Sequence, residues 1–546
     1  MLKDKIYSIY YTVKNDNLKY RRCKMIIKKI KINNFKKFKD ETTIDFNDDF
    51  NIIIGNNESG KSTVLQAIEL VLSGSQSRID SIGLENIFNN EVIDTFMNGE
   101  KEYKKLPEIY IELYLNDTGN PDLNGNNNTE KIMCDGLYLR ISPNDEFSKE
   151  IYEILEKENF AFPFEYYKCE FKKFSDYPFN NYNKPIHYIV IDNSNISNEY
   201  FMKEYITSLY RAYTDSSLKN QYNNDFRKLK KDFEENNLKK LNEKVPQIDF
   251  GLSTHTKYSL ENNLTIYEQG INIQNKGFGS QCILKIKSSI DKCAENIDII
   301  LIEEPENHLS DMNMKRMLID IINNKSKQTF ITTHNSVICS RLNLKKLIAL
   351  GEGNNVITSD FRKIDKDTAD FFIKCPSYNI LNFILSNKVI LVEGAAEYIL
   401  MEKFYETINK KNPNEDEVNI ISVSGLSFER YLKIAQALNI EVAVLTDNDH
   451  DYENNITKKY AEYISDKIKV YSDSNNERYT FEVCLYEDNK DLFENKMKLT
   501  ISSDKLKFMI NNKAESAYRI LKELENSNIT IKIPNYIKDA LKWIKL

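Results

Sequence analysis

Two parts of this 546-residue sequence combine residue types and spacings that can do chemistry on phosphates. In the first, Gly55–Ser62 reads GNNESGKS and fits the pattern GxxxxGK[ST], directly after an apolar run and directly before a helical one. Backbone N–H groups in such a loop hold phosphates, Lys61 can reach the β and γ oxygens, and Ser62 can coordinate Mg²⁺. We predict an ATP and Mg²⁺ site with contacts from Gly55, Asn56, Asn57, Gly60, Lys61, Ser62 and Thr63.

A pair of adjacent carboxylates, Glu303 and Glu304, follows four consecutive apolar residues, Ile299 to Ile302. Two adjacent acids are more often a solvated surface, but a fully apolar strand delivers these two to a sheet edge. We expect Glu303 to hold Mg²⁺ through water and Glu304 to orient or deprotonate the attacking water. A histidine at a strand end is usually structural; after these motifs, we expect His334 to contact the γ-phosphate.

A second acidic set lies between Glu393 and Asp449. Glu393 closes the run VILV, Glu397 lies one helical turn later, and Asp447 and Asp449 alternate after AVLT. Carboxylates are the hard oxygen ligands that Mg²⁺ or Mn²⁺ prefers. Two metal ions held by such a set can activate water and clamp a scissile phosphate. These four residues are predicted metal ligands, and Glu393 and Asp447 are also predicted to be catalytic.

Two parallel α/β sheets are needed to position these sets. IDIILIEEPE at 297–306 and QTFITTH at 328–334 are short β-rich runs with a helix between them, and NIIIG before the glycine-rich loop is a third run. From Lys388 onward, KVILVEG, NIISVSG and EVAVLTDND each end in polar or acidic residues, at the strand ends where open sheets bind ligands. The predicted fold class is α/β, with a P-loop ATPase head followed by a Rossmann-like parallel-sheet domain.

A charged helical stretch from about Asn198 to Val245 interrupts the first pattern. Phe226, Leu229 and Phe233 form a narrow apolar stripe among its lysines. A solvated surface helix is one interpretation, and a dimerisation element is the other. The final segment IPNYIKDALKWI is predicted to be a packing helix, with one apolar face made by Ile537, Ala540, Leu541 and Ile544.

Composition limits the class of protein. The net charge of -7 requires any nucleic-acid contact to come from a local basic patch or from bound metal ions. Eight cysteines with no CxxC pair, and only five histidines, favour buried free thiols in a reducing cytosol over a zinc site. No run resembles a signal peptide or a membrane span, so we expect a cytoplasmic protein with no membrane partner. Residues 1–24 are either an extra arm or the product of an upstream start codon.

The motifs GNNESGKST, LIEEPENHL and TTHNS, in that order, resemble the ABC-type ATPases of the SMC/RecF/Rad50-like group. The segment Gly277–Gln281 resembles a degenerate ABC signature. Because such ATPases bind nucleotide between two heads, the resemblance implies that Gly279 and Ser280 of one subunit face the phosphate loop of another. A dimer or larger even-numbered oligomer is therefore expected.

The downstream stretches VILVEGAAEYILMEKF, ISVSGLSFERYLKIAQALNI and VAVLTDND resemble the Toprim domain of OLD-family nucleases, a family that includes the large subunit of the Gabija defence system. This resemblance implies an ATP-regulated, metal-dependent endonuclease of double-stranded DNA with a role in anti-phage defence. It also implies a metal ligand at Glu482, in YTFEVCLY, and a catalytic cation at Lys513, in NNKAESAYRIL. Taken by themselves, Glu482 could be a strand-surface acid and Lys513 a helix-cap lysine.

Other functions fit less of the chain. A DNA-binding SMC/RecF-type ATPase without nuclease activity is the main alternative, but it needs no second acidic set. A topoisomerase or primase does not ordinarily carry an ABC head, and a transporter motor needs a membrane partner. These motifs fit an enzyme that acts alone as well as one that works with a UvrD-like helicase. They also fit both activation and inhibition of cleavage by ATP.

The predicted domains are an N-terminal extension at 1–24, the first ATPase segment at 25–197, the helical insert at 198–245, the second ATPase segment at 246–380 and the Toprim domain at 381–546.

Overall fold

A computed structural model describes residues 24–157, 159–192, 199–245, 248–253, 259–290, 297–307, 309–323, 327–351, 356–357, 360–374, 379–424, 427–497, 504–526 and 529–545. The chain divides into two compact units, which are described separately. The first comprises Met1–Thr333 and Glu352–Val356, and the second comprises His334–Gly351 and Ile357–Leu546. Residues 1–23 of the predicted N-terminal extension lie outside the described residues.

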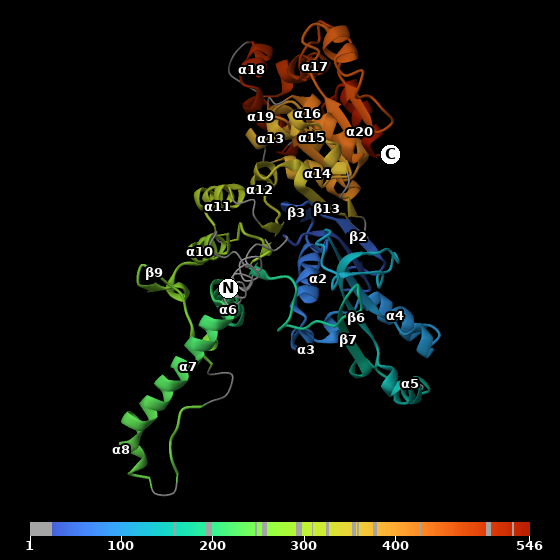
Figure 1. Ribbon diagram of the computed structural model, residues 1–546. Coiled ribbons are helices and arrows are strands. Elements are labelled where there is room, and N and C mark those ends of the chain that lie inside the picture. Colours follow the sequence, from blue (N-terminus) through green and yellow to red (C-terminus); the bar gives the residue numbers. More distant parts are fainter. Residues whose placement is uncertain are drawn as a thin grey trace, which may run out of the picture. The chain divides into compact units, whose positions relative to one another are not determined.

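The core of the first unit contains two large sheets (Figure 1). The parallel sheet has the order β3-β12-β11-β8, and its strands pair in register. All six residues of β3 and all five of β12 are buried, as is typical of strands inside a parallel sheet. These strands are β3 Phe50–Gly55, β8 Tyr188–Asp192, β11 Ile299–Glu303 and β12 Gln328–Thr332.

An antiparallel sheet covers the same core from the other side. Its order is β2-β1-β4-β6, with β5 and β7 both paired to β6, and α2 contacts strands of both sheets. These elements are β1 Ile27–Asn33, β2 Thr42–Asp45, β4 Ile109–Leu115, β5 Asn124–Gly125, β6 Cys134–Pro143, β7 Tyr167–Lys173 and α2 Lys61–Ser73. Around them lie α3 Gln76–Ile82, α4 Asn90–Asn98 and α5 Ser148–Leu155.

The helical insert forms an arm. Helix α6 Glu199–Tyr213 contacts β8, and α7 Ser216–Phe233 extends away from it toward α8 Lys239–Asn242 (Figure 1). Leu229 is 63% exposed and Phe233 is 44% exposed, so the predicted apolar stripe faces solvent in a single chain. The unit also contains α9 Leu260–Asn263, the hairpin β9 Tyr267–Glu268 and β10 Ile271–Asn272, α10 Phe278–Ile290 and α11 Asp311–Asn323.

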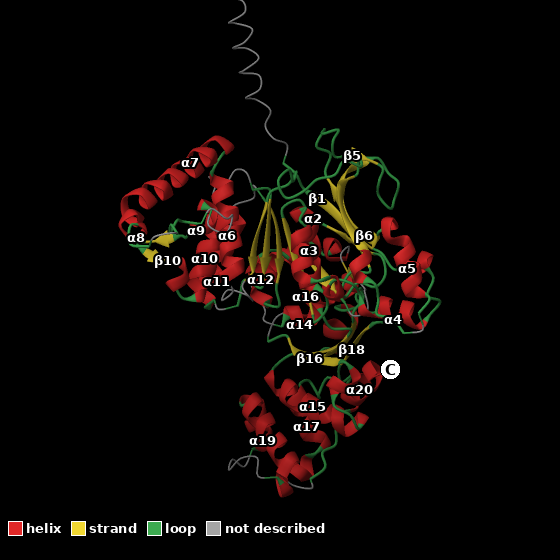
Figure 2. Cartoon of the chain, turned by 90° about the horizontal axis from the view of Figure 1, so that it is seen from below, coloured by secondary structure: helices red, strands yellow, loops and turns green. Residues whose placement is uncertain are grey.

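The second unit is built on a four-stranded parallel sheet of order β16-β15-β17-β18. Helices α14 and α16 lie on one face and α15 and α20 on the other (Figure 2). The buried residues of α20 are Ile537, Ala540, Leu541 and Ile544, which confirms the predicted packing face. The strands are β15 Lys388–Val392, β16 Val418–Ser422, β17 Glu441–Leu445 and β18 Ile468–Tyr471.

The helices of this unit are α12 Ser336–Arg341, α13 Lys366–Lys374, α14 Ile380–Ile384, α15 Ala395–Asn409, α16 Phe428–Leu438, α17 Phe481–Asp488, α18 Lys505–Asn511, α19 Lys513–Asn526 and α20 Asn535–Lys545. The short strand β13 Leu347–Leu350 also belongs to it. Helices α12 and α13 precede residue 381, yet they group with this unit, because α12 packs on α13 and α14. The predicted second ATPase segment, at 246–380, instead includes residues 334–380.

Among the described residues, no helix has both the length and the apolarity to cross a bilayer. The five cysteines that fall within them, Cys134, Cys169, Cys282, Cys339 and Cys484, are free thiols, and the last three are buried.

Candidate functional site

The glycine-rich loop forms a cradle between β3 and α2. Gly60 has φ +98°, and a Cβ added there would lie 3.3 Å from the Phe38 ring, so both backbone strain and crowding favour glycine. Lys61 is buried, and its Nζ donates to the carbonyl oxygens of Gly55 (2.9 Å) and Asn56 (3.0 Å). A pocket of about 340 Å³ opens over the loop and is lined by the segment Asn57–Thr63 together with Lys37 and Glu304.

The two predicted acids lie at the end of β11, beside this pocket. Glu303 accepts a hydrogen bond from the Ser62 side chain, and burial raises the pKa of Glu303. Ser62 and Glu303 are therefore placed to share the sphere of one Mg²⁺ ion. Glu304 has φ +41°, a backbone strain held by its N–H donating to the Thr332 carbonyl at 3.0 Å. Glu304 lines the phosphate pocket, and its Oε2 accepts a hydrogen bond from the Asn307 side chain at 2.9 Å.

Three residues that line the pocket, Lys37, Glu58 and Ser59, are missing from the sequence predictions. Lys37 lines it from the turn after β1, and the basic run NNFKKF was the available signal. Burial lowers the pKa of Lys61, whereas the charges of Glu304, Glu306 and Glu303 oppose that shift, so Glu306 belongs to the same electrostatic cluster. Glu306 accepts a hydrogen bond from the Thr333 hydroxyl at 2.6 Å. Glu306 is the third acid of the EEPE motif, after the two acids with predicted roles.

The remaining predicted nucleotide contacts lie elsewhere. Ser280 lies on the exposed first turn of α10, where its N–H donates to the Gly277 carbonyl at 2.9 Å. It is not among the residues that line the phosphate pocket of the described chain. His334 follows Thr333 after β12 and belongs to the second unit. Its contact with a γ-phosphate stays a prediction.

The second acidic set is assembled from four segments of the second unit. Glu393 follows β15, and Glu397 lies in the first turn of α15, where its Oε2 accepts from the Gly394 N–H at 3.2 Å. Asp447 follows β17 and accepts from the Phe481 N–H at 2.8 Å, which ties it to the start of α17. Glu482 lies in α17, not on a strand, and is 1% exposed. Lys513, the first residue of α19, places its Nζ 3.2 Å from Glu482 and 4.0 Å from Asp447.

The carboxylates of this cluster repel one another. Burial raises the pKa of Asp447 to about 8, and the charges of Glu393 and Glu397 add to the shift. Burial likewise raises the pKa of Glu397 to about 7, with contributions from Glu482 and Glu393. A buried anionic cluster of this kind is stabilised by cations. Lys513 supplies one positive charge.

Asp449 differs from the other predicted ligands, because it is exposed and has φ +49°. Its N–H donates to the Tyr479 carbonyl at 3.2 Å. Between the two aspartates, the buried Asn448 side chain lies within hydrogen-bond distance of the carbonyls of Asp473 (2.8 Å), Asn475 (3.0 Å) and Arg478 (3.4 Å). Asn448 therefore fixes the 447–449 turn against the loop before α17.

The carboxylates of this cluster are the right kind of ligand for a divalent metal ion, but they do not yet lie at the distances that a bound ion requires. Neither carboxylate oxygen of Glu482 accepts a hydrogen bond with good geometry. The contact between Glu482 and Lys513 is therefore an ion pair. In the described part of the chain, no three His, Cys, Asp or Glu side chains already converge tightly enough to hold a metal ion. Glu393, Glu397, Asp447 and Glu482 are the residues that would hold one, after small side-chain movements.

Two family models match successive parts of the chain. A model of the AAA ATPase domain matches residues 25–339, and a model of the overcoming lysogenization defect protein-like TOPRIM domain matches residues 384–449.

Two curated relatives are nucleases by name. The endonuclease GajA of Bacillus cereus (strain HuB5-5) is 23% identical, over 95% of this chain and 99% of that protein. The Old nuclease of Escherichia phage P2 is 24% identical, over 31% of this chain and 30% of that protein. Among solved structures, the C-terminal region of the Xanthomonas campestris pv. campestris OLD protein aligns with 29% of this chain and 95% of its own length, at 19% identity and a TM-score of 0.21.

Proposed function

Because the chain belongs to the AAA ATPase domain family and carries an OLD-like TOPRIM domain after the ATPase segment, we propose that it is an ATP-regulated, metal-dependent DNA endonuclease. The observation that carries this proposal is the cluster of Glu393, Glu397, Asp447 and Glu482 around Lys513. A DNA-binding ATPase without nuclease activity would have no use for four mutually repelling acids at one sheet edge.

The chain's own residues supply positioning and charge at the scissile phosphate. Glu393 and Asp447 stand at the ends of adjacent parallel strands, where their carboxylates can orient cations against a phosphate oxygen. Lys513 can donate to a non-bridging oxygen of the phosphate and offset the charge that develops there. Bound Mg²⁺ or Mn²⁺ ions would lower the pKa of the attacking water and stabilise the leaving oxygen.

The residues of the ATPase segment have separate roles in binding and hydrolysing ATP. Lys61 holds phosphate oxygens after it releases the Gly55 and Asn56 carbonyls, and Ser62 with Glu303 holds Mg²⁺. Glu304 acts on the attacking water. Ser280 would complete the pocket of a second copy of the chain, since it lies on an exposed helix start.

The arm supports self-association. The exposed side chains of Leu229 and Phe233 on α7 favour a contact with a second copy, and a permanent contact would raise the effective concentration of the two heads. Leu229→Glu with Phe233→Glu should shift the oligomer toward monomer in light scattering at micromolar concentration. A wild-type monomer with both activities intact would contradict this assignment.

A role in anti-phage defence extends the proposal to the cellular level, and its support is the likeness to OLD-family proteins. An enzyme of the OLD type would act alone, whereas one of the Gabija type would work with a UvrD-like helicase. The relative named GajA supports this extension through its match to nearly the whole chain.

The test is plasmid cleavage by the purified chain in Mg²⁺, Mn²⁺ or EDTA, with ATP titrated from zero. We expect cutting in either metal, none in EDTA, and a rate that depends on ATP. Asp447→Ala, checked for folding by circular dichroism, should not cut. Cutting by Asp447→Ala and Glu393→Ala at the wild-type rate would overturn the site, and ATP hydrolysis without any cutting would favour the DNA-binding ATPase.

A further inference from the structure

An exposed turn beside the carboxylate cluster holds two consecutive residues in a backbone conformation that side chains rarely adopt. Asp449 has φ +49° and His450 has φ +66°, and neither is glycine. Such residues persist where the surrounding structure fixes them, and they gather at functional sites. Here the Asp449 N–H donates to the Tyr479 carbonyl at 3.2 Å, and the His450 N–H donates to the Asn448 side-chain oxygen at 2.9 Å. The fold therefore presents His450 at a fixed position.

The imidazole ring of His450 is held in place as well. It stacks on the Tyr479 ring, with 3.7 Å between the centroids and 26° between the planes. Its Nδ1 lies 3.1 Å from the Asn476 carbonyl oxygen, which accepts a hydrogen bond in the tautomer that carries the proton on Nδ1. His450 is nevertheless exposed. Because Tyr479 covers one face of the ring, the opposite face and the Nε2 edge are available to a ligand.

The charges around this ring disfavour a direct contact with phosphate. Asp449 and Glu477 are exposed acids. The neighbouring cation Arg478 is held by Asp473 at 2.7 Å and by Asp488 at 3.0 Å. A flat, uncharged, aromatic group can stack on the open face of the ring without a cation to offset these acids. A nucleobase is such a group, and stacking on aromatic side chains is a common way of binding one.

We propose that His450, backed by Tyr479, is a stacking platform for one unpaired nucleobase of the DNA substrate. Asp447 and His450 lie on the same turn. A base on this ring would therefore belong to a nucleotide at or next to the phosphate held by the carboxylate cluster. The choice of DNA as the ligand rests on the proposed function, whereas the position and exposure of the ring do not.

The platform requires a base that lies outside the double helix. Inside a duplex each base is already stacked between its neighbours, so a protein ring reaches its face only when the base is single-stranded or turned out of the helix. Stacking depends little on the identity of the base, because every base has a π face. The platform should therefore confer a preference for unpaired DNA over duplex DNA, without a preference for sequence.

The experiment is a fluorescence anisotropy titration of the full chain in Ca²⁺, which takes oxygen ligands as Mg²⁺ does. The probes are a fluorescein-labelled single-stranded oligonucleotide without self-complementarity and the duplex that it forms with its complement. His450→Asn removes the ring, and asparagine tolerates the left-handed backbone. This variant should bind the single strand about 5-fold to 100-fold more weakly, as expected for one lost stacking contact, and should bind the duplex as the wild type does.

Two further variants separate stacking from other roles of His450. His450→Phe keeps a flat ring without nitrogen atoms, so its affinity for the single strand should return to the wild-type level. Tyr182→Ala removes a 98% exposed ring from the first unit and is the matched control, which should bind both probes as the wild type does. Mn²⁺ affinity should be unchanged in all three variants, because only a structural role of His450 would disturb the turn that carries Asp447 and Asp449.

Wild-type affinity of His450→Asn for the single strand, or an equal loss of affinity for both probes, would overturn the proposal. So would weaker Mn²⁺ binding by His450→Asn, or a failure of His450→Phe to restore binding, which would assign the ring nitrogens to a metal ion or a hydrogen bond. Plasmid cleavage by the wild type keeps the two proposals apart. Ring-dependent binding without cleavage would support the platform and overturn the nuclease, whereas cleavage with wild-type binding by His450→Asn would do the reverse.

Discussion

The phosphate pocket of the first unit and the carboxylate cluster of the second each place a lysine, Lys61 or Lys513, close to several acids, but they hold that lysine differently. Lys61 donates to two backbone carbonyls, and the three glutamates around it act at a distance. Lys513 instead pairs directly with Glu482 and lies close to Asp447. The first site is therefore a backbone cradle that awaits phosphate, and the second is a side-chain cluster that awaits cations.

This difference shows how each site depends on the rest of the fold. Eight consecutive residues, Gly55–Ser62, make most of the first site, so local geometry decides its shape. The second site joins residues between Glu393 and Lys513 in sequence, so its shape depends on how α15, α17 and α19 pack on the sheet. Substitutions in the second site should therefore disturb both chemistry and packing, whereas those in the first should disturb chemistry alone.

The largest expected effect comes from exchanging one acid in each site. Glu482→Gln should reduce DNA cleavage about a thousandfold or more, because loss of a metal ligand removes several kcal/mol of transition-state stabilisation. Its ATP hydrolysis should stay at the wild-type level. Glu304→Gln should instead reduce the rate of ATP hydrolysis about a hundredfold or more, as expected for the loss of a general base. Parallel plasmid and phosphate-release assays check both, and equal loss of hydrolysis in both variants would break the comparison.

Lys61→Ala should weaken ATP binding about 10-fold to 100-fold, as expected for a lost charge-assisted contact with phosphate. Glu304→Gln is its matched partner and should bind ATP as tightly as the wild type, because that carboxylate acts on water. Fluorescent nucleotide titration measures both affinities. An identical loss of affinity in the two variants would show that Glu304 holds nucleotide rather than water.

Lys513→Met should separate metal binding from cleavage in the second site. Removing an ammonium group 3.2 Å from Glu482 leaves more negative charge for divalent cations, so Mn²⁺ affinity should rise. Cleavage should nevertheless fall about tenfold to a hundredfold, because one donor to the phosphate is lost. Lys507→Met, on the exposed side of α18, is the control for a general loss of positive charge. Weaker Mn²⁺ binding by Lys513→Met would refute the cation role of this lysine.

The smallest expected effect concerns Asn448, whose side chain is shared among three carbonyls of the loop before α17. Asn448→Ala should lower the free energy of unfolding of the second unit by about 1–3 kcal/mol, because the three carbonyls lose a buried donor. The chain has a single tryptophan, Trp543 in α20, so urea denaturation followed by its fluorescence reports on this unit. Asn454→Ala, an exposed neighbour, should change the value by far less.

The sequence predicted the elements that contiguous patterns encode. The apolar runs before Gly55, Glu303 and Glu393 are buried strands, and the packing face of α20 has the expected four residues. Glu482 illustrates the limit: TFEVCLY alternates as a strand would, yet Thr480 caps a helix there by accepting from the Val483 N–H. The alternation of this segment fits a strand, and tertiary packing, which the local sequence does not reveal, favours the helix instead.

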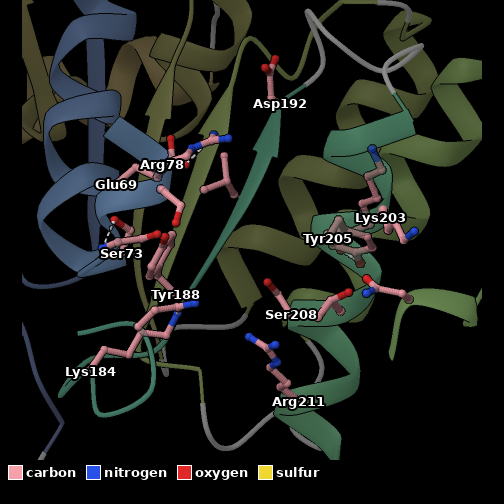
Figure 3. Close-up of a pocket in the computed structure, with 17 residues that line it drawn as sticks. Glu69, Ser73, Arg78, Lys184, Tyr188, Asp192, Lys203, Tyr205, Ser208 and Arg211 are labelled. Atoms are coloured by element: carbon pink, nitrogen blue, oxygen red, sulfur yellow. Dashed lines mark hydrogen bonds and ion pairs between the residues drawn. The ribbon is translucent and has the colours of Figure 1, made fainter. Parts of the chain in front are cut away.

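A polar cavity of about 280 Å³ lies beside β8, where residues of α2, α3 and α6 line it together with the buried Lys285 of α10 (Figure 3). It could not have been predicted in the same way. Lys285 lies in a helix with ordinary amphipathic spacing, and no local signal distinguishes it from a solvated lysine. Its burial depends on β8 and on Tyr205 of α6, whose hydroxyl donates to the Lys285 carbonyl at 2.9 Å. Contacts across 80 residues of chain have no signature in a single sequence.

Helix α20 has a consequence for the order in which the chain is made. It packs on β15, β17 and β18, and its residues Leu541 and Ile544 share one core with Ile390 and Leu445, which precede Glu393 and Asp447. The ribosome synthesises all of these strands before it reaches residue 535. A chain arrested before α20 would have the phosphate loop, but one face of the second sheet would be covered only in part, so we expect the strand ends that carry Glu393 and Asp447 to lack part of their supporting core.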